Sequence, residues 1–416
     1  MFHSFGHGLN ISLRGAPEQQ VSPCNNVGSV ALYGADYPGV RPEVLVAEGD
    51  MIQCGEPVFR DRHRPEICMT APVSGQIDKI EIGARRRLTS VVIKSDGAQP
   101  LVFARPDSLT RDSLQALMLE TGLWPALTER PFGKIPDPGS APDALFVTAM
   151  QTEPLSADAR IVLAQAPEAF AQGIAALKCL TDGAVFVCQG RGDDLADVDD
   201  QVQIERFSGP HPAGLPGTHI DRLFPLKQGR VVWQIDYQTV LALGVVLATG
   251  SLPETQVIAL AGPGVAKPRL IRAPAGVRLD DLLAGELTAG QKSVLSGSVL
   301  SGRQSAFLRR KHWQVSVIDR AQPKPTRVRS WLPIHSAAER PRPVIPTQAL
   351  ARALGPKLPV VPLFRALSVG DVETAEKLGA RGLLEEDLAL ASYAAGGDVD
   401  LGALLRRALD VIEAQA

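Results

Sequence analysis

Two continuous apolar runs separated by a helical pattern constrain the fold of this 416-residue chain most strongly. Residues 144–150 (ALFVTAM) and 184–190 (AVFVCQG) are predicted to be buried strands, and residues 157–178 a helix that breaks near Pro167. Strands without polar alternation are buried on both faces, and a strand–helix–strand order is typical of a parallel sheet with a crossover helix. Because RVVWQID (230–236) and the helical run after it repeat this pattern, we predict a Rossmann-like α/β domain over residues 106–254.

The α/β domain is expected to begin with a helix over residues 107–121, which Gly122 ends. The residues spaced for one buried stripe on this helix are Leu109, Leu114, Leu117 and Met118.

Residues 1–105 are predicted to form a β-rich barrel-sandwich hybrid domain, because short strand patterns alternate there with turn dipeptides. Residues 46–77 resemble the carrier domain of biotin and lipoyl enzymes, whose modified lysine stands at a hairpin tip about seven residues before an Ala-Pro pair. Arg64 occupies that position, and arginine offers no nucleophilic amine. We therefore expect a docking module whose charged tip, Arg60 to Glu66, is available for protein contacts.

The remainder of the chain divides into three predicted segments. Residues 255–320 place two strands around a Gly/Pro turn before a short amphipathic segment, which fits a β-grasp unit. Residues 321–365 are rich in proline and basic residues and are predicted to be a linker or arm. Residues 366–416 are predicted to form a helical domain.

Composition excludes several classes of function. A net charge of −2 gives no electrostatic case for nucleic acid as a partner. The longest apolar run, residues 240–248, is about half of the roughly 20 residues that a membrane span needs. The N-terminus lacks the features of a signal peptide, which predicts a cytoplasmic protein. The five cysteines form no CxxC pair, so neither an iron–sulfur cluster nor structural zinc is expected.

Two GxG stretches do not predict a nucleotide site. Gly190-x-Gly192 is followed by Asp193 and Asp194, whose charges would repel a pyrophosphate. In the second stretch, residues 262–264 (GPG), a proline removes one amide donor and no long helix follows. We interpret the first as an acidic loop and the second as a tight turn.

The stretch FSGPHPAGLPGTHI, residues 207–220, is the most unusual in composition, and we name it the Gly/Pro loop. Glycine permits close backbone approach and proline fixes the path of the chain, so the loop should have one specific conformation. His211 and His219 could donate hydrogen bonds to a carbonyl group or shuttle protons near neutral pH. The alternative is a rigid interdomain loop with exposed imidazoles.

A basic run extends from Arg309 to Arg342, with Trp313 and Trp331 interleaved. It is either a solvated arm or a surface that faces an anionic membrane leaflet or an acidic partner. Its basic residues are Arg309, Arg310, Lys311, Arg320, Lys324, Arg327, Arg329, Arg340 and Arg342.

Long motifs across nearly the whole chain resemble the NqrA family, the A subunits of the sodium-translocating NADH:quinone reductase, which is a six-subunit bacterial membrane complex. They include GAPEQ (15–19), VALYGADYPGVRP (30–42), TAPVSGQI (70–77), ETGLWPALTERPFGKIPDP (120–138), GPHPAGLPGTHI (209–220), SGSVLSGR (296–303) and LEEDLALASY (384–393). The family is related to the C subunit of Rnf complexes and to the flavin subunit of respiratory complex I. The resemblance implies the same four units: barrel-sandwich hybrid, Rossmann-like domain, β-grasp unit of the soluble-ligand-binding (SLBB) type and helical domain.

The resemblance also implies a function. The chain is expected to be a peripheral subunit on the cytoplasmic side of the inner membrane, held by membrane subunits and contributing to the quinone-reducing end of a translocase. It should bind no cofactor; ubiquinone is the substrate of the complex, and NADH, FAD, FMN, riboflavin and iron–sulfur centres are expected on the other five subunits, B to F. The candidate quinone contacts are His211, Gly214, Gly217 and His219. The candidate partner or membrane contacts are Arg309, Arg310, Lys311, Arg327 and Arg329.

Two departures from the family pattern are visible. Ala391 and Ala395 stand where other members carry cysteines, and residues 320–365 look shorter than is usual. The alternatives are a ligand-free assembly scaffold, an orphan paralogue, or a carrier protein, which would need an acceptor lysine. The lysines nearest to the hairpin tip are Lys79 and Lys94, both beyond the Ala-Pro turn.

Overall fold

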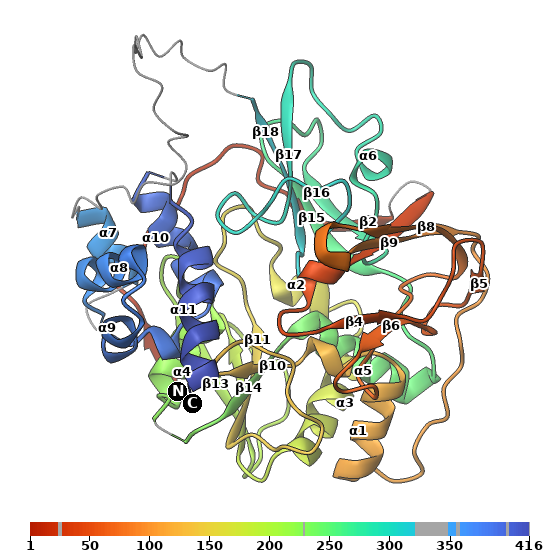
Figure 1. The fold of residues 1–416 in the computed structure, drawn as a ribbon, viewed down its shortest axis with the longest axis horizontal. Coiled ribbons are helices and arrows are strands. Elements are labelled where there is room, and N and C mark those ends of the chain that lie inside the picture. Colours follow the sequence, from red (N-terminus) through yellow and green to blue (C-terminus); the bar gives the residue numbers. More distant parts are fainter. Residues whose placement is uncertain (24–26, 228, 321–347, 355–357, 397–398, 416) are drawn as a thin grey trace.

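The computed structural model describes residues 1–23, 27–227, 229–320, 348–354, 358–396 and 399–415. Four units pack side by side, with the α/β unit at the centre and the C-terminal helices against one side of it (Figure 1). None of the helices in these ranges is long and apolar enough to span a membrane.

The α/β unit contains a six-stranded sheet in the order β1-β13-β12-β11-β14-β10. All neighbours are parallel except the edge strand β10, which is antiparallel to β14. The predicted strands and the helix break before Pro167 are confirmed, whereas β13 and α4 were not predicted. The elements are β1 (Phe2–Ser4), α1 (Arg111–Glu120), β10 (Thr128–Arg130), β11 (Ala144–Ala149), α2 (Ala159–Leu163), α3 (Pro167–Leu177), β12 (Ala184–Gln189), β13 (Val202–Ser208), α4 (Pro216–Leu223), β14 (Val232–Asp236) and α5 (Tyr237–Thr249).

Helix α1 begins later than the sequence predicts. Thr110 is its N-cap and accepts a hydrogen bond from the Ser113 amide, so Leu109 lies outside the helix and is 43% exposed. Leu114, Leu117 and Met118 are buried as expected.

The N-terminal unit consists of two small sheets, in the orders β3-β9-β8-β5 and β4-β6-β7. Arg64, at the carrier position, donates hydrogen bonds to Asp61 within the tip and to the Ile135 carbonyl oxygen at 2.9 Å. The tip therefore docks on the α/β unit of its own chain. The strands are β3 (Ser29–Tyr33), β4 (Pro42–Val44), β5 (Met51–Ile52), β6 (Pro57–Asp61), β7 (Cys68–Thr70), β8 (Gly75–Ile82) and β9 (Leu88–Ser95).

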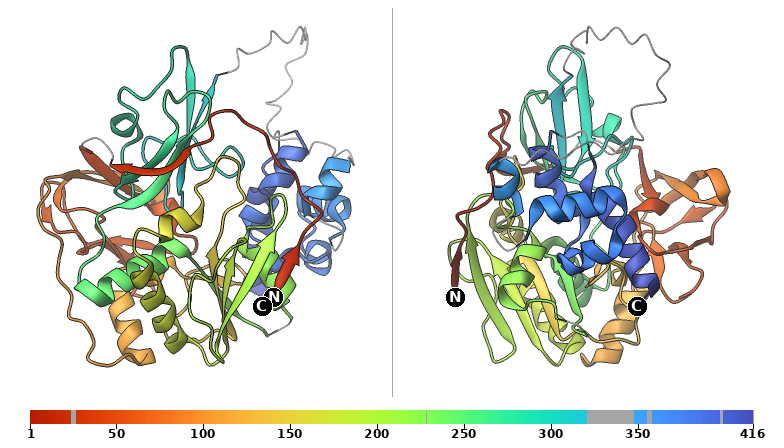
Figure 2. Two further views of the ribbon diagram at one scale, coloured as in Figure 1. Left: turned by 180° about the vertical axis from the view of Figure 1, so that it is seen from behind. Right: turned by 60° about the vertical axis from the view of Figure 1, so that its left-hand side comes forward.

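The first 23 residues of the predicted domain 1–105 pair with the sheets of two other units. Strand β1 joins the α/β sheet, and β2 (Glu18–Pro23) pairs with β16 of the β-grasp sheet. Residues 5–17, here named the strap, run between them past the C-terminal helices (Figure 2). The Gly8 amide donates to the Arg352 carbonyl oxygen at 2.9 Å, and the Gly262 amide donates to that of Gly15 at 2.8 Å. The strap thus joins three units.

The β-grasp unit has a five-stranded sheet in the order β17-β18-β15-β16-β2. As the sequence predicts, its first two strands flank the Gly/Pro turn at 262–264, and a short helix follows. Its own elements are β15 (Gln256–Ala261), β16 (Arg269–Ala273), α6 (Leu279–Leu282), β17 (Lys292–Ser296) and β18 (Gln314–Asp319).

The helical unit begins earlier than residue 366. Helix α7 (Gln348–Leu354) lies wholly within the segment 321–365 that was expected to be an arm, and α8 (Val360–Val369) begins within it. Leucine, valine and phenylalanine side chains of these two helices form part of the core of the helical unit. The other helices are α9 (Val372–Lys377), α10 (Ala389–Ala394) and α11 (Leu401–Gln415). Ala391 and Ala395 pack in or against this core.

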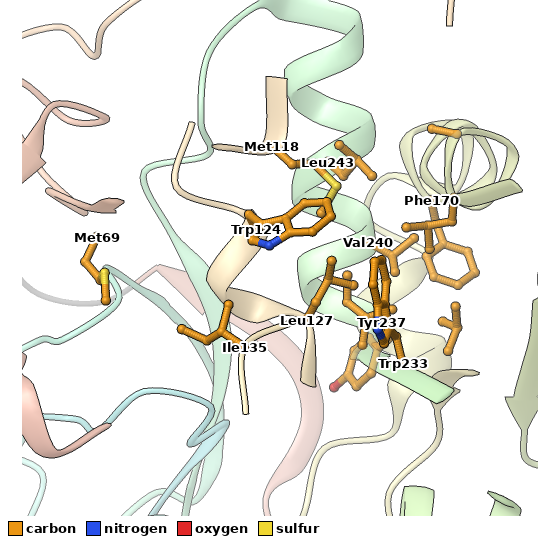
Figure 3. Close-up of a cluster of buried hydrophobic side chains, with 14 of the residues drawn as sticks. Met69, Met118, Trp124, Leu127, Ile135, Phe170, Trp233, Tyr237, Val240 and Leu243 are labelled. Carbon is orange, nitrogen blue, oxygen red and sulfur yellow. The ribbon is translucent and has the colours of Figure 1, made fainter. Parts of the chain in front are cut away.

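The largest hydrophobic core is continuous between the N-terminal and α/β units. Trp124 and Trp233 meet edge to face with ring centroids 5.4 Å apart, beside Tyr237 and Val240 of α5 (Figure 3). This shared core fixes how the two units are placed, and therefore fixes the walls of the cavity between them.

Candidate functional site

A cavity of about 2640 Å³ lies where the four units meet. The N-terminal unit contributes residues 33–42, and the α/β unit contributes the ends of its central strands. The β-grasp unit contributes residues 297–303 and 309–314, and the helical unit contributes residues from Leu384 to Ala414. A site here would be sensitive to the relative positions of all four units.

The floor of the cavity is the point where the strand order of the parallel sheet reverses. From β11 the chain continues to β12 and β13 on one side, whereas β14 pairs with the other side of β11. The carboxyl ends of two such strands leave a crevice between their connections, and ligands of open α/β sheets bind there. Thr148 and Asp236 are neighbours in the register at this end and both line the cavity.

The Thr148 hydroxyl is a buried polar group at this end of the sheet. Thr148 is only 8% exposed, and its Oγ1 atom has no hydrogen-bond partner among the described residues. The Asp236 carboxylate already has hydrogen-bond partners. It accepts hydrogen bonds from the Thr239 amide at 2.9 Å and from the Thr239 hydroxyl at 2.7 Å, and it thereby caps the N-terminus of α5. Because buried polar groups are normally paired, the hydroxyl of Thr148 marks a position for a ligand atom.

Arg309 and Arg310 do not belong to a solvated arm, which corrects that interpretation. Arg309 Nε donates to Asp36 Oδ1 at 2.7 Å, and its guanidinium lies 4.4 Å from the centroid of the Tyr33 ring. Arg310 lies over the Tyr37 ring at 4.6 Å and donates to the Pro125 carbonyl oxygen. These contacts join the β-grasp unit to its neighbours. Arg327 and Arg329 lie outside the described residues.

Lys311 lines the cavity and has an unusual conformation. Its φ is 60°, in the left-handed region that residues other than glycine rarely adopt, and its ammonium group donates to the Thr128 hydroxyl. The residue keeps exposed surface, and that surface forms part of the cavity wall, where neighbouring units crowd around the side chain. This enclosure, together with Arg310, lowers the pKa of Lys311 to about 7, although Asp236 and Glu386 oppose the shift.

Both histidines of the Gly/Pro loop are buried, so the alternative of exposed imidazoles is wrong. His219 Nε2 contacts the Ala213 carbonyl oxygen at 2.9 Å, and burial lowers the pKa of His219 to about 3. The pKa of His211 is also lowered by burial, and its Nδ1 lies 3.2 Å from Thr152 Oγ1. His219 therefore stays neutral at physiological pH, which excludes it as a proton shuttle near neutrality.

The glycines of the loop are needed for close packing. A Cβ atom on Gly214 would lie 2.8 Å from Thr152 Oγ1, and one on Gly217 would overlap the Asp387 carboxylate. Gly214 lines the large cavity, whereas Gly217 lines a second cavity of about 980 Å³ next to it. Neither His211 nor His219 lines either of these two cavities, so the four predicted residues do not converge on one surface.

A buried arginine that the sequence did not single out fixes the helical wall of the cavity. Arg130 is 1% exposed; it donates to Asp387 Oδ2 at 2.8 Å, to Glu386 Oε1 at 3.0 Å and to Gln234 Oε1 at 2.8 Å. Arg130 and Asp387 are 257 residues apart in the chain. Both lie in long family motifs, but nothing in the sequence indicates that those motifs meet.

The chain has no evident metal site in the part that the structure describes. No group of three or more His, Cys, Asp or Glu side chains there is arranged to hold a metal ion. The large cavity is lined by many polar and charged residues, among them Thr148 and Lys311.

Comparisons with known proteins agree with this layout. Family models match residues 4–96 (NqrA N-terminal barrel-sandwich hybrid domain), 109–252 (NqrA second alpha/beta domain) and 257–306 (NQRA C-terminal domain). Proteins named as the A subunit of the Na(+)-translocating NADH-quinone reductase are 40% identical in Pseudomonas aeruginosa, 42% in Klebsiella pneumoniae and 39% in Marinomonas sp., each over 98% of both chains.

Similarity to solved structures is much weaker. The crystal structure of an NAD+-reducing [NiFe]-hydrogenase in the H2-reduced state matches with a TM-score of 0.39 and 15% identity, over 74% of this chain and 61% of that one. No conclusion about this chain rests on that similarity.

Proposed function

The chain belongs to the NqrA family, the A subunits of the Na(+)-translocating NADH-quinone reductase, and we propose that it is a peripheral component of the quinone-reducing end of such a complex. Membership covers the whole chain, since the matched relatives extend over 98% of it. In this proposal the other five subunits are its partners and carry the NADH, flavin and iron–sulfur chemistry. The chain docks on the cytoplasmic side of the membrane subunits.

One observation supports a direct contact with quinone: an unpartnered, buried hydroxyl at the floor of the large cavity. Quinone recognition needs hydrogen-bond donors for carbonyl oxygens and an apolar slot for the ring. Thr148 provides the donor in this proposal, and Tyr33 and Tyr37, whose rings stack on Arg309 and Arg310, also line the cavity. The cavity, about 2640 Å³, exceeds the roughly 300–1,000 Å³ of a drug-sized pocket, which leaves room for part of an isoprenoid tail.

The Gly/Pro loop has a supporting role in this proposal. Gly214 places backbone atoms on the cavity wall. The other three residues stabilise the conformation of the loop, Gly217 through close packing and the two histidines, His211 and His219, through hydrogen bonds. The loop thus shapes the quinone site, while Thr148 at the strand end contacts the ligand.

Calorimetric titration of the isolated chain with a short-chain ubiquinone tests the proposal. We expect saturable binding to the wild type and binding that is about 3- to 10-fold weaker for Thr148→Val, which removes one hydrogen bond while keeping the side-chain shape. The matched control is Thr249→Val at the exposed end of α5, which should bind like the wild type.

A folded wild-type chain without saturable heat would refute quinone binding by this protein and would favour the ligand-free scaffold. Saturable binding that Thr148→Val leaves unchanged would place the quinone elsewhere on the chain.

A further inference from the structure

We propose, resting on the quinone binding proposed above, that the ammonium group of Lys311 donates a hydrogen bond to a quinone oxygen in the large cavity and makes that binding depend on pH. Lys311 would then be a ligand-contacting residue in its own right, supplied by the β-grasp unit, in a cavity that Thr148 of the α/β sheet also lines. Its geometry, its lack of a carboxylate partner and its surroundings each support this role.

The backbone holds Lys311 in a conformation that only its neighbours can enforce. A left-handed φ is unfavourable for a residue with a side chain, and such strain persists where the surrounding structure determines it. On one side, the chain is fixed by Arg309 and Arg310 through Asp36. On the other side, His312 Nδ1 lies 2.8 Å from the Ser296 hydroxyl oxygen. Contacts on both sides therefore fix the backbone at Lys311, and both Lys311 and its partner Thr128 line the cavity.

The ammonium group has donor capacity to spare. It carries three N–H donors, and among the described residues the Thr128 hydroxyl is its hydrogen-bond partner. No carboxylate in the described part of the chain lies within ion-pair distance of it. Asp236 and Glu386 act on it from farther away, and each is engaged elsewhere: Asp236 caps α5, and Glu386 pairs with Arg130. A cation on the cavity wall with unused donors suits a carbonyl oxygen or a developing oxyanion.

The sign of the expected pH dependence follows from the groups that face Lys311. Enclosure and Arg310 hold its pKa near 7, so the free chain loses this proton as pH rises through 7. A quinone oxygen accepts a stronger, charge-assisted hydrogen bond from the ammonium form than from the neutral amine. Ligand affinity should therefore be highest below pH 7 and should fall above it, by at most tenfold per pH unit. Arg130 and Arg310 stay charged throughout this range.

Titration with a short-chain ubiquinone between pH 6 and 9 tests the inference on the full chain. For the wild type we expect an affinity that falls about tenfold or more from pH 6 to pH 9. Lys311→Met should bind at least about tenfold more weakly at pH 6 and show no fall with pH. Lys311→Arg should recover part of the affinity without the pH dependence, because arginine does not titrate in this range.

The control variant is Lys79→Met, which removes an exposed lysine paired with Glu81 and should behave like the wild type. Equal affinity and an equal pH slope in wild type and Lys311→Met would overturn the role of Lys311 while leaving quinone binding intact. Absence of wild-type binding at every pH would overturn both proposals. Loss of binding in Lys311→Arg as well as in Lys311→Met would overturn the inference that a positive hydrogen-bond donor at this position holds the quinone oxygen.

Discussion

Replacing Arg130 with methionine is expected to lower the local free energy of unfolding of the C-terminal helices by about 3 to 5 kcal/mol. Arg130 is buried, and its guanidinium joins β10 of the α/β sheet to Asp387 and Glu386 at the helical wall of the cavity. Methionine keeps most of the side-chain volume but leaves the Asp387 carboxylate, which is 7% exposed, without its cation. A buried charge that has lost its partner is the source of the large effect.

Hydrogen exchange at the amides of α11 measures this effect without assuming that the whole chain unfolds in one step. Protection should fall by roughly two to three and a half powers of ten, since each 1.4 kcal/mol is a factor of ten. The matched control is Arg381→Met, because Arg381 pairs with Glu376 where both side chains are about 40% exposed, 37% and 41%. An exposed pair contributes about 0–1 kcal/mol.

Adding Asp387→Asn to Arg130→Met should restore part of the lost protection, because the asparagine removes the more deeply buried of the two carboxylate charges that Arg130 pairs with. If Arg130→Met and Arg381→Met lowered protection equally, the buried ion pair would not be what holds the helical unit in place.

The second large effect is expected for Gly244→Ala, which should destabilise the α/β unit by about 3 kcal/mol or more. Helices α3 and α5 cross with their backbones in contact: a Cβ on Gly244 would overlap the Ala169 carbonyl oxygen, and one on Gly173 would overlap that of Val240. Overpacking usually costs about 1–3 kcal/mol, and here the obstacle is backbone rather than a flexible side chain. The roughly 1 kcal/mol gained by replacing glycine within a helix does not offset it.

Urea unfolding followed by tryptophan fluorescence measures this loss, because Trp124 and Trp233 are buried in the core below α5. Gly190→Ala is the control: no atom lies within 4 Å of the position its Cβ would take, and surface changes of this kind stay within about 0.5 kcal/mol. A Gly244→Ala midpoint equal to that of the control would show that the two helices can separate at little cost.

The sequence predicts those parts of the fold whose signal is local. Strands β11, β12 and β14 are continuous apolar runs, and α5 follows β14 directly, so their order and burial could be read from the residues. Strand β13 was missed because its buried and exposed residues alternate irregularly over VQIERFS. Helix α4 was missed because it begins with Pro216 inside the Gly/Pro loop, where a loop is the usual interpretation.

The parts that could not be predicted depend on contacts between distant residues. Nothing in residues 1–23 shows that they join two sheets of other units, since Arg206, more than 200 positions away, donates to Met1. The basic run illustrates the same limit at the site. In the sequence, Arg309 and Arg310 look like part of a solvated arm. In the structure, Arg309 donates a hydrogen bond to Asp36, and the two guanidinium groups stack on the rings of Tyr33 and Tyr37. The burial of His211 and His219 likewise follows from packing that the loop sequence does not reveal.

A crystal structure of the chain soaked with a brominated short-chain quinone tests the central claim most directly, because bromine gives an anomalous signal that locates the ring. The account predicts one peak in the large cavity, at the carboxyl ends of β11 and β14 between Thr148 and Lys311. Absence of a peak at saturating quinone, or a peak confined to the second cavity beside Gly217 and Arg222, would contradict it.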